Sequence, residues 1–389
     1  MEILWKYDLP TNQSSDDYQY EGPIFVKEDN LCFICDCFID HKSEQFLYIV
    51  NKNSGEMRKK FCFPKKTVIP AKCFFEEYGE QIIIYTGTLW ILHGEKLSAL
   101  FDQPIDDEIN SYLIYENNFI FADRSSLYCI DIDAKCLKWQ LQLSNTKNYT
   151  IGDISLFENS VSCYGNDQLL FIDISNGKVL NQIKVPRVDK LFNPIRMKDG
   201  SLLIGFTNWS NAGILRYDVT AKKVIWKCSR SFEGPLLRRK IFLQNDLVFW
   251  VKNDTELICV NIENGNEIYR TKTTPGLYTD PVFLNGRILY GTAGRDGFLV
   301  SLAAETGSEN WAFPLKNGCA YFDLYHNSAI VGDFEKRIYQ IDLVSGNVLQ
   351  EIQADGEVVG RIKVYQSEVY TVIWGNADQP IRLIKLKIT

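Results

Sequence analysis

The chain of 389 residues is 46% apolar and 23% charged, a balance that indicates a folded protein and excludes a disordered one. Its 42 basic and 49 acidic residues give a net charge of −7, which argues against a general nucleic-acid binder because such proteins need a basic face. No apolar run approaches the ~18 residues of a membrane span, the N-terminus lacks a secretory pattern, and the 11 cysteines are irregularly spaced, so we expect a cytoplasmic protein with reduced thiols.

The first predicted element is an alternating strand at residues 1–10, MEILWKYDLP, which carries Trp5. Similar tryptophan-bearing stretches occur at 135–144, 223–229 and 308–315, and each of them closes a repeating unit. Residues 1–10 have no such unit in front of them. We therefore expect this strand to complete a unit that comes from another part of the chain.

The repeating unit is clearest at residues 337–352, RIYQIDLVSGNVLQEI, which predict a hairpin of two alternating strands. Asp342 can accept hydrogen bonds from the backbone just after it and so begin the turn, while Gly346 supplies the positive φ that ends it. Lysine replaces this glycine at Lys135 and Lys222, so we expect those two turns to be strained or to use another geometry. The same frame recurs at 46–60, 127–141, 169–183, 214–228, 256–270 and 298–313.

One period runs through the chain. The residues at the turn-starting position stand at 51, 93, 131, 173, 218, 261, 303, 342 and, in degenerate form, 385. Two further strand-like runs lie between successive markers, as at 155–165 and 320–334, so each unit has four short strands. A period near 42 with four strands predicts an all-β, closed β-propeller of four-stranded antiparallel blades. The count is nine blades, and the shortened turn at 89–101 leaves eight as an alternative.

The last unit, within residues 358–389, has three strands and lacks the tryptophan-bearing fourth. We predict that residues 1–10 supply that strand and close the ring, which removes an unpaired sheet edge. The whole chain, 1–389, is then a single β-propeller domain.

This repeat resembles the PQQ-like, or quinoprotein-type, β-propeller family, in which an apolar strand is followed by Asp, two residues, Thr-Gly and a Trp four places after the Gly. Gly307 and Trp311 have this spacing, and Trp139 and Trp226 lie four places after the lysines that replace glycine. WD40 and kelch propellers fit less well, because neither a recurring Gly-His and Trp-Asp pair nor a Gly-Gly doublet is found. The resemblance covers nearly the whole chain and specifies fold better than function.

The resemblance also bears on cofactors. The family includes exported quinone-dependent alcohol dehydrogenases, which hold their cofactor with an adjacent cysteine pair, a stacking tryptophan and calcium ligands. It also includes an outer-membrane assembly lipoprotein, whose signal peptide ends at a lipidated cysteine. This sequence has no adjacent cysteines, and its first cysteine is Cys32. We therefore expect no cofactor, and a role in protein binding is favoured over a role as an enzyme.

A cluster of cysteines raises the alternative of a thiolate zinc site. Cys32, Cys35 and Cys37 lie close together, with Cys62 or Cys73 nearby. On a strand, however, residues 35 and 37 face the side opposite to residue 32, so the three thiols cannot converge without a bend. Small buried side chains are the favoured interpretation, and we expect no metal.

The remaining polar motifs favour structural roles, so we expect no catalytic residue. The three histidines are isolated in sequence, and Asp131 and Asp133 are interpreted as part of a turn. The stretch 290–297 lacks the helix of a phosphate-binding loop. The basic clusters at 58–66 and 237–240 are interpreted as solvated strand edges, where lysine also deters edge pairing.

The loops that lead from the outer strand of one blade to the next blade all emerge on one rim of a propeller. Nine such loop windows carry −4 of the net charge of −7, and several contain aromatic residues. Aromatic side chains ringed by carboxylates suit a protein partner with a basic, partly apolar face, and the alternative is that these loops are simply solvated. The predicted partner-binding rim consists of Tyr18, Tyr20, Asp106, Asp107, Glu108, Tyr149, Phe192, Phe232 and Tyr278.

Together these observations predict a non-catalytic, protein-binding propeller of the bacterial cytoplasm, monomeric by itself, with no nucleic-acid or membrane partner. The favoured interpretation is an immunity protein that neutralises a toxin. A scaffold in a larger assembly is the first alternative. A quinone- or sugar-binding propeller enzyme is the second, and it would need convergent ligands in the central channel.

Overall fold

The structure is a computed structural model, and most of the chain that it describes is β-structure. The described residues are 1–8, 23–39, 42–63, 73–101, 109, 111–123, 125–143, 154–165, 168–208, 210–231, 241–252, 254–273, 276–292, 296–317, 319–358, 361–374 and 382–388. They form 37 β-strands in nine antiparallel sheets. None of these residues belongs to a helix long and apolar enough to cross a membrane.

Each sheet is one propeller blade, and we number the blades 1 to 9. Blade 1 runs from β2 (Ile24–Lys27) to β5 (Met57–Cys62), and blade 9 contains β37 (Arg382–Lys387). Eight blades have four strands paired in chain order, and blade 9 has five. Each of the nine turn markers of the sequence falls in a different sheet. The predicted all-β propeller fold of four-stranded antiparallel blades is confirmed, with nine blades rather than eight.

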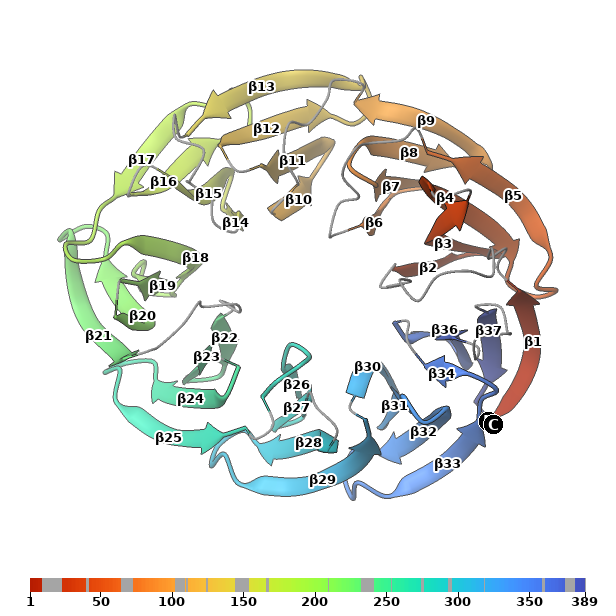
Figure 1. Cartoon of the computed structure of the whole chain (residues 1–389). Helices are drawn as coiled ribbons and strands as arrows, with labels where there is room; N and C mark the ends of the chain where they lie inside the picture. The colour runs from red at the N-terminus through yellow and green to blue at the C-terminus, as the bar shows by residue number, and fades with distance from the viewer. Residues whose placement is uncertain are drawn as a thin grey trace. The chain divides into compact units, whose positions relative to one another are not determined.

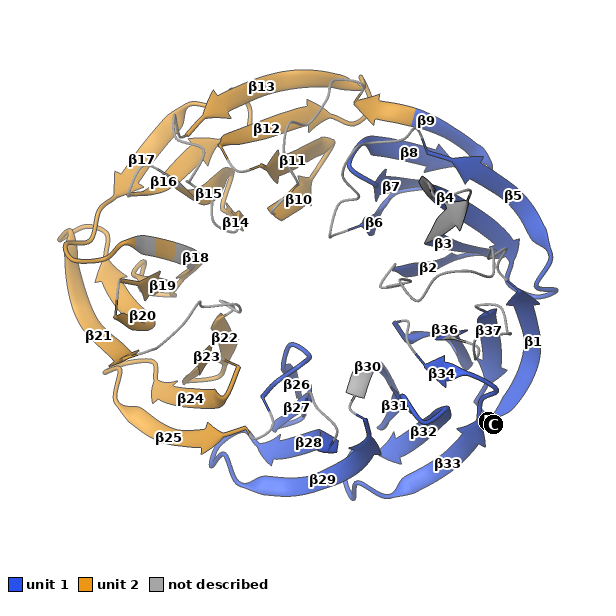
Figure 2. Cartoon of the chain, in the orientation of Figure 1, with its two compact units in different colours: residues 1–98, 274–389 blue, residues 99–273 orange. Residues whose placement is uncertain are grey.

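The chain divides into two compact units (Figure 2). Unit 1 comprises residues 1–98 and 274–389, and unit 2 comprises residues 99–273. The boundary at residues 98 and 99 falls within strand β9 (Lys96–Phe101). The expectation of a single domain over 1–389 stays a prediction.

Unit 1 contains blades 1, 2, 7, 8 and 9, apart from the end of β9. Their strands are β2 (Ile24–Lys27), β3 (Asn30–Ile39), β4 (Lys42–Asn51) and β5 (Met57–Cys62) in blade 1; β6 (Phe74–Tyr78), β7 (Gln81–Tyr85), β8 (Leu89–His93) and β9 (Lys96–Phe101) in blade 2; β26 (Val282–Leu284), β27 (Arg287–Gly291), β28 (Asp296–Ala303) and β29 (Glu309–Lys316) in blade 7; β30 (Cys319–Tyr325), β31 (Ser328–Asp333), β32 (Arg337–Asp342) and β33 (Val348–Gln353) in blade 8; and β34 (Glu357–Val358), β35 (Lys363–Tyr365), β36 (Glu368–Trp374), β37 (Arg382–Lys387) and β1 (Glu2–Asp8) in blade 9.

Unit 2 contains blades 3 to 6. Their strands are β10 (Ser111–Tyr115), β11 (Asn118–Ala122), β12 (Ser126–Asp131) and β13 (Cys136–Gln142) in blade 3; β14 (Ser155–Phe157), β15 (Ser160–Gly165), β16 (Gln168–Asp173) and β17 (Val179–Ile183) in blade 4; β18 (Lys190–Arg196), β19 (Leu202–Thr207), β20 (Asn211–Asp218) and β21 (Lys223–Ser231) in blade 5; and β22 (Ile241–Gln244), β23 (Leu247–Lys252), β24 (Glu256–Asn261) and β25 (Glu267–Lys272) in blade 6.

The N-terminal strand β1 forms the last strand of blade 9 and lies beside β37 (Figure 1). The two strands pair antiparallel, with Glu2 opposite Lys387 and Asp8 opposite Arg382. An ion pair of 2.7 Å joins Arg382 Nε to Asp8 Oδ1 at the end of this ladder. The prediction that the start of the chain completes the last blade is confirmed for residues 2–8, while residues 9 and 10 lie outside the described ranges.

An ion pair between a buried lysine and a partly exposed glutamate lies where blade 9 meets blade 1. Lys385 is 2% exposed, and its Nζ lies 2.6 Å from the Glu368 carboxylate and 2.9 Å from the carbonyl oxygen of Lys52. Burial alone would raise the pKa of Glu368, but hydrogen bonds from Lys385 and Tyr370 outweigh it and hold that pKa below its usual range. The charged form of Glu368 is therefore the one that the fold favours.

The turns between third and fourth strands follow the predicted chemistry. Asp342 Oδ1 accepts the backbone N–H of Ser345 at 2.7 Å, and the Gly346 N–H donates to the Asp342 carbonyl at 2.9 Å, with Gly346 at a φ of +73°. Lys135 and Lys222 have φ values of +53° and +52° at the equivalent position. The lysines thus adopt the left-handed conformation, so these two turns carry the strain that a Cβ causes there.

The core lies between neighbouring blades. The second and third strands are largely buried, and all six residues of β19 are buried. In unit 2, for example, one apolar cluster joins Phe171 of blade 4 to Leu202 and Leu215 of blade 5. Since each blade buries its faces only against its neighbours, a single blade cannot form a core of its own.

Candidate functional site

The predicted rim falls mostly on residues outside the described ranges. These are Tyr18, Tyr20, Asp106, Asp107, Glu108, Tyr149 and Phe232. Phe192 lies in β18, the first strand of blade 5, but its side chain is outside the described part of the structure. Tyr278 is described, is 36% exposed, and has its ring centroid 6.0 Å from that of Tyr321. The rim stays a prediction, with Tyr278 as an exposed aromatic residue on it.

The cysteines of the alternative zinc site lie in different environments. Cys32 is fully buried in β3, and burial raises the pKa of its thiol to about 12, so the thiolate form is strongly disfavoured at neutral pH. Cys62 is exposed and Cys73 is partly exposed, while the side chains of Cys35 and Cys37 are not described. Within the described ranges, no group of three or more His, Cys, Asp or Glu residues is placed to hold a metal ion.

Other polar motifs have structural positions. Asp131 Oδ1 accepts a backbone N–H of its own turn at 2.9 Å, which is the role predicted for it. His93 Nε2 lies 3.7 Å from a carboxylate oxygen of Glu80 at an exposed position. The ring of His326 packs edge-on against a neighbouring tyrosine, and His41 lies outside the described ranges.

Tryptophans on fourth strands join successive blades by a repeated contact. Each indole N–H donates to the backbone carbonyl one residue past the turn marker of the next blade, a relation that spacing alone did not reveal. The four pairs are Trp5 with Lys52 at 2.9 Å, Trp139 with Ile174 at 2.7 Å, Trp226 with Ile262 at 3.2 Å, and Trp311 with Leu343 at 3.2 Å.

The same indoles lie against the glycine that ends each of those turns. A Cβ built on the glycine would come within 2.5 to 2.9 Å of the ring, which is closer than real Cβ atoms approach. Glycine is therefore needed there for close approach as well as for positive φ. The glycines are Gly55, Gly177, Gly265 and Gly346.

This contact explains the lysine turn at Lys222. The residue that corresponds to the tryptophan in the preceding blade is Asn181. The register supports this at Asn181, which stands opposite Phe171 as Trp226 stands opposite Arg216. With no indole to accommodate, the turn tolerates a Cβ. The sequence carries this relation, because a tryptophan in the fourth strand of one repeat goes together with a glycine in the turn of the next repeat.

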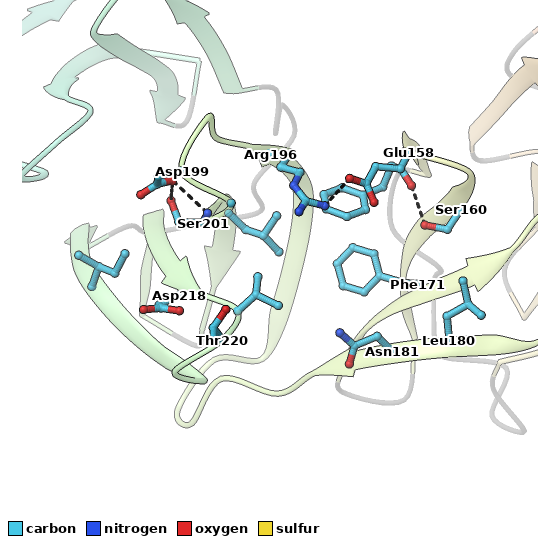
Figure 3. A pocket seen from close by; sticks show the side chains of 15 residues that line it. Glu158, Ser160, Phe171, Leu180, Asn181, Arg196, Asp199, Ser201, Asp218 and Thr220 are labelled. Atoms are coloured by element: carbon cyan, nitrogen blue, oxygen red, sulfur yellow. Dashed lines mark hydrogen bonds and ion pairs between the residues drawn. The ribbon is translucent and has the colours of Figure 1, made fainter.

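A groove opens in unit 2 where Asn181 stands in place of a tryptophan, between blades 4 and 5 (Figure 3). It holds a cavity of about 690 Å³. Phe171 and Leu202, which are 5% and 1% exposed, form its floor. Leu180 and Ile225, which are 62% and 45% exposed, border its mouth. This groove is a candidate binding site.

One charged pair lies at the end of the groove near the turn of blade 4. Arg196 Nη1 is 2.5 Å from Glu158 Oε1, and the Arg196 guanidinium lies 5.5 Å from the centre of the Phe157 ring. The arginine therefore has both an anionic and an aromatic partner within the protein.

A second arginine is buried behind the groove. Arg216 is 6% exposed and donates to Asp199 at 2.8 Å, to Glu263 at 2.9 Å and to Ser201 Oγ at 2.9 Å. Hydrogen bonds from Ser201 and then from Arg216 hold the pKa of Asp199 at about 2, well below the usual range. Asp218 Oδ1 accepts only the backbone N–H of its own turn and has no ion pair within the described ranges. The groove thus carries a surplus of negative charge.

Comparison with known proteins supports the class of fold. Residues 210–323 match a PQQ-type family model described as "Outer membrane protein assembly factor BamB", a stretch that includes Trp226 and Trp311. The resemblance to PQQ-like propeller repeats is thereby confirmed. A search of curated proteins gave no match.

Two solved structures are similar in fold. BamB from Moraxella catarrhalis has a TM-score of 0.54 at 14% identity, covering 80% of this chain and 96% of its own. The computationally designed protein Ika8 has a TM-score of 0.55 at 11% identity, covering 99% of this chain and 100% of its own. At these identities the likeness concerns the fold, so function has to be argued separately.

Proposed function

We propose that this chain is a non-catalytic propeller that works by binding another protein. The observation that supports the proposal is the match of residues 210–323 to a model named for an outer membrane protein assembly factor. A protein of that name acts together with other proteins, and propeller loops offer broad surfaces for such contacts. The cytoplasmic location and monomeric state expected from the sequence belong to the same proposal.

Within this class we favour a bacterial immunity protein that binds and neutralises a toxin. The support is the net charge of −7, of which the predicted rim windows carry −4, because such a surface suits a basic partner. The second candidate is a scaffold in a larger assembly, and the assembly-factor match is the observation that favours it.

Affinity capture from the source cells tests the proposal. The tagged chain, at its natural expression level, is crosslinked and recovered beside the matched variant Asp106→Lys with Asp107→Lys. We expect one polypeptide in stoichiometric amount with the wild type and less of it with the variant. A toxin is recognised by growth inhibition that this chain relieves. Recovery of no polypeptide would contradict the proposal, and equal recovery with both chains would place the partner away from the rim.

Thermal melting with PQQ and calcium tests the enzyme alternative. A ligand at a hundred times its Kd stabilises the folded state by about 2.7 kcal/mol, which raises the melting temperature of a chain of this size by a few degrees. We expect no change. A rise of that size with PQQ, or with a sugar, would contradict a non-catalytic role.

A further inference from the structure

We propose that the groove between blades 4 and 5 binds an aromatic side chain of a partner polypeptide that has a basic residue beside it. This inference rests on the proposed protein-binding function and names one surface and one chemistry for it. It is argued from the chain's own filled grooves, from the shape of the cavity and from its charge.

The chain itself shows what such a groove accepts. At four other junctions an indole fills the space between a fourth strand and the next turn, donating its N–H to the turn carbonyl at 2.7 to 3.2 Å. Between blades 4 and 5 the corresponding strand residue is Asn181, and the cavity takes the place of the ring. Val219 occupies the position of the accepting carbonyl, and that carbonyl receives no hydrogen bond from the described residues. An acceptor for a ring N–H is therefore left unused.

A visiting ring can overlap the position of the internal indoles only in part, because the turn residue of this groove has a Cβ. Lys222 has a Cβ at the place where a Cβ on the four glycines would come within 2.5 to 2.9 Å of an indole. A partner's ring must enter more deeply, over the apolar floor of Phe171 and Leu202 and toward Phe157. The volume of about 690 Å³ is typical of ligand pockets and leaves room for this position.

The mouth of the groove suits a polypeptide. Leu180 and Ile225, which line the groove, are 62% and 45% exposed, and a partner chain that carries the ring would cover these side chains. Apolar rims of this kind around a pocket are typical of sites where an anchor side chain inserts.

The charge of the groove favours a basic residue beside the aromatic side chain of the partner. Arg196 and Arg216 already pair with Glu158, Asp199 and Glu263. The carboxylate of Asp218 lines the groove without an ion pair in the described part of the chain. A lysine or arginine next to the aromatic residue would neutralise it, whereas an acidic neighbour would be repelled.

Peptide binding tests the inference directly. The probe is the synthetic tripeptide acetyl-Lys-Trp-Lys-amide with 5-fluorotryptophan, which is followed by fluorine NMR as the full chain is added. The key variant is Asn181→Trp with Lys222→Gly, which gives this groove an internal indole and the glycine that accommodates it. Lys222→Gly alone is the matched control, because it leaves the groove empty.

We expect the probe to bind the wild type and Lys222→Gly, and to bind the double variant at least tenfold more weakly. Leu180→Lys, at an exposed position, should also weaken binding and serves if the double variant fails to fold. Asp218→Asn should weaken this probe but not the matching peptide with alanine in place of both lysines. No binding to the wild type at millimolar peptide, or undiminished binding to both the double variant and Leu180→Lys, would overturn the inference.

The two proposals fail in different ways. If the peptide does not bind but a protein is captured from cells, the partner uses another surface and only this inference is wrong. If the peptide binds but no protein partner exists, the proposed function is wrong and the groove is an isolated pocket for aromatic groups.

Discussion

Alanine at Gly346 tests the tryptophan contacts between blades, and Gly286 offers a matched control. Both glycines have a φ of +73°, so alanine at either position carries the same left-handed strain, about 1–2 kcal/mol. A Cβ at Gly286 meets nothing within 4 Å, whereas a Cβ at Gly346 would lie 2.6 Å from Trp311 Cγ. The indole must then shift, and overpacking of this kind costs about 1–3 kcal/mol more.

We therefore expect Gly286→Ala to lower the free energy of unfolding by about 1–2 kcal/mol and Gly346→Ala to lower it by about 2–5 kcal/mol. Urea unfolding measures both, and unchanged m values show that the midpoints report stability. In a Trp311→Ala background the extra loss at Gly346 should vanish, because the clashing ring is gone. Equal losses in the two alanine variants, or an extra loss that persists without the ring, would refute the packing argument.

Four further outcomes are expected. Lys222→Gly should raise the free energy of unfolding by about 0.5–1 kcal/mol in urea, because it removes left-handed strain; a loss of stability would contradict this. Trp5→Ala should lower it by about 2–4 kcal/mol, since the half-buried ring joins blade 9 to blade 1, and an unchanged urea midpoint would count against that role. The ionised Glu368 carboxylate should stabilise the fold above its ordinary pKa of 4.5, and this stabilisation should be lost as the pH falls through its lower pKa in the folded state. The urea midpoint of Glu368→Gln should therefore change less between pH 6 and pH 3 than that of the wild type. Asp106→Lys with Asp107→Lys should slow association with a basic partner in stopped-flow mixing, and added salt should slow the wild type likewise.

Much of the fold could be predicted because each repeat is specified by residues that are close together in the sequence. The turn-starting Asp342 and turn-ending Gly346 specify a hairpin by themselves, and repetition of that hairpin specifies a propeller. The role of β1 followed from counting strands in the sequence, since the last repeat predicts only three strands and lacks the tryptophan-bearing one. The strain at Lys222 could be predicted because the last position of this turn needs a positive φ, which is unfavourable for a residue with a Cβ.

The groove could not be predicted in the same way. Asn181 is an ordinary residue within its own unit, and its meaning depends on the turn of the next blade, which only the fold brings beside it. The internal contact of Trp139 with Gly177 shows the rule, after which the pairing of Asn181 with Lys222 becomes informative. The rim was predicted from loop composition alone, which records charge and aromatic content but not the position of side chains.

The central claim is that this chain acts through a bound protein. Native mass spectrometry of the chain purified gently from its source cells tests that claim most directly, because it reports the mass of whatever remains attached. The account predicts a complex heavier than the chain by one folded polypeptide, which dissociates as ionic strength is raised. A mass equal to the chain alone at natural concentration, or to the chain with a small molecule, would contradict it.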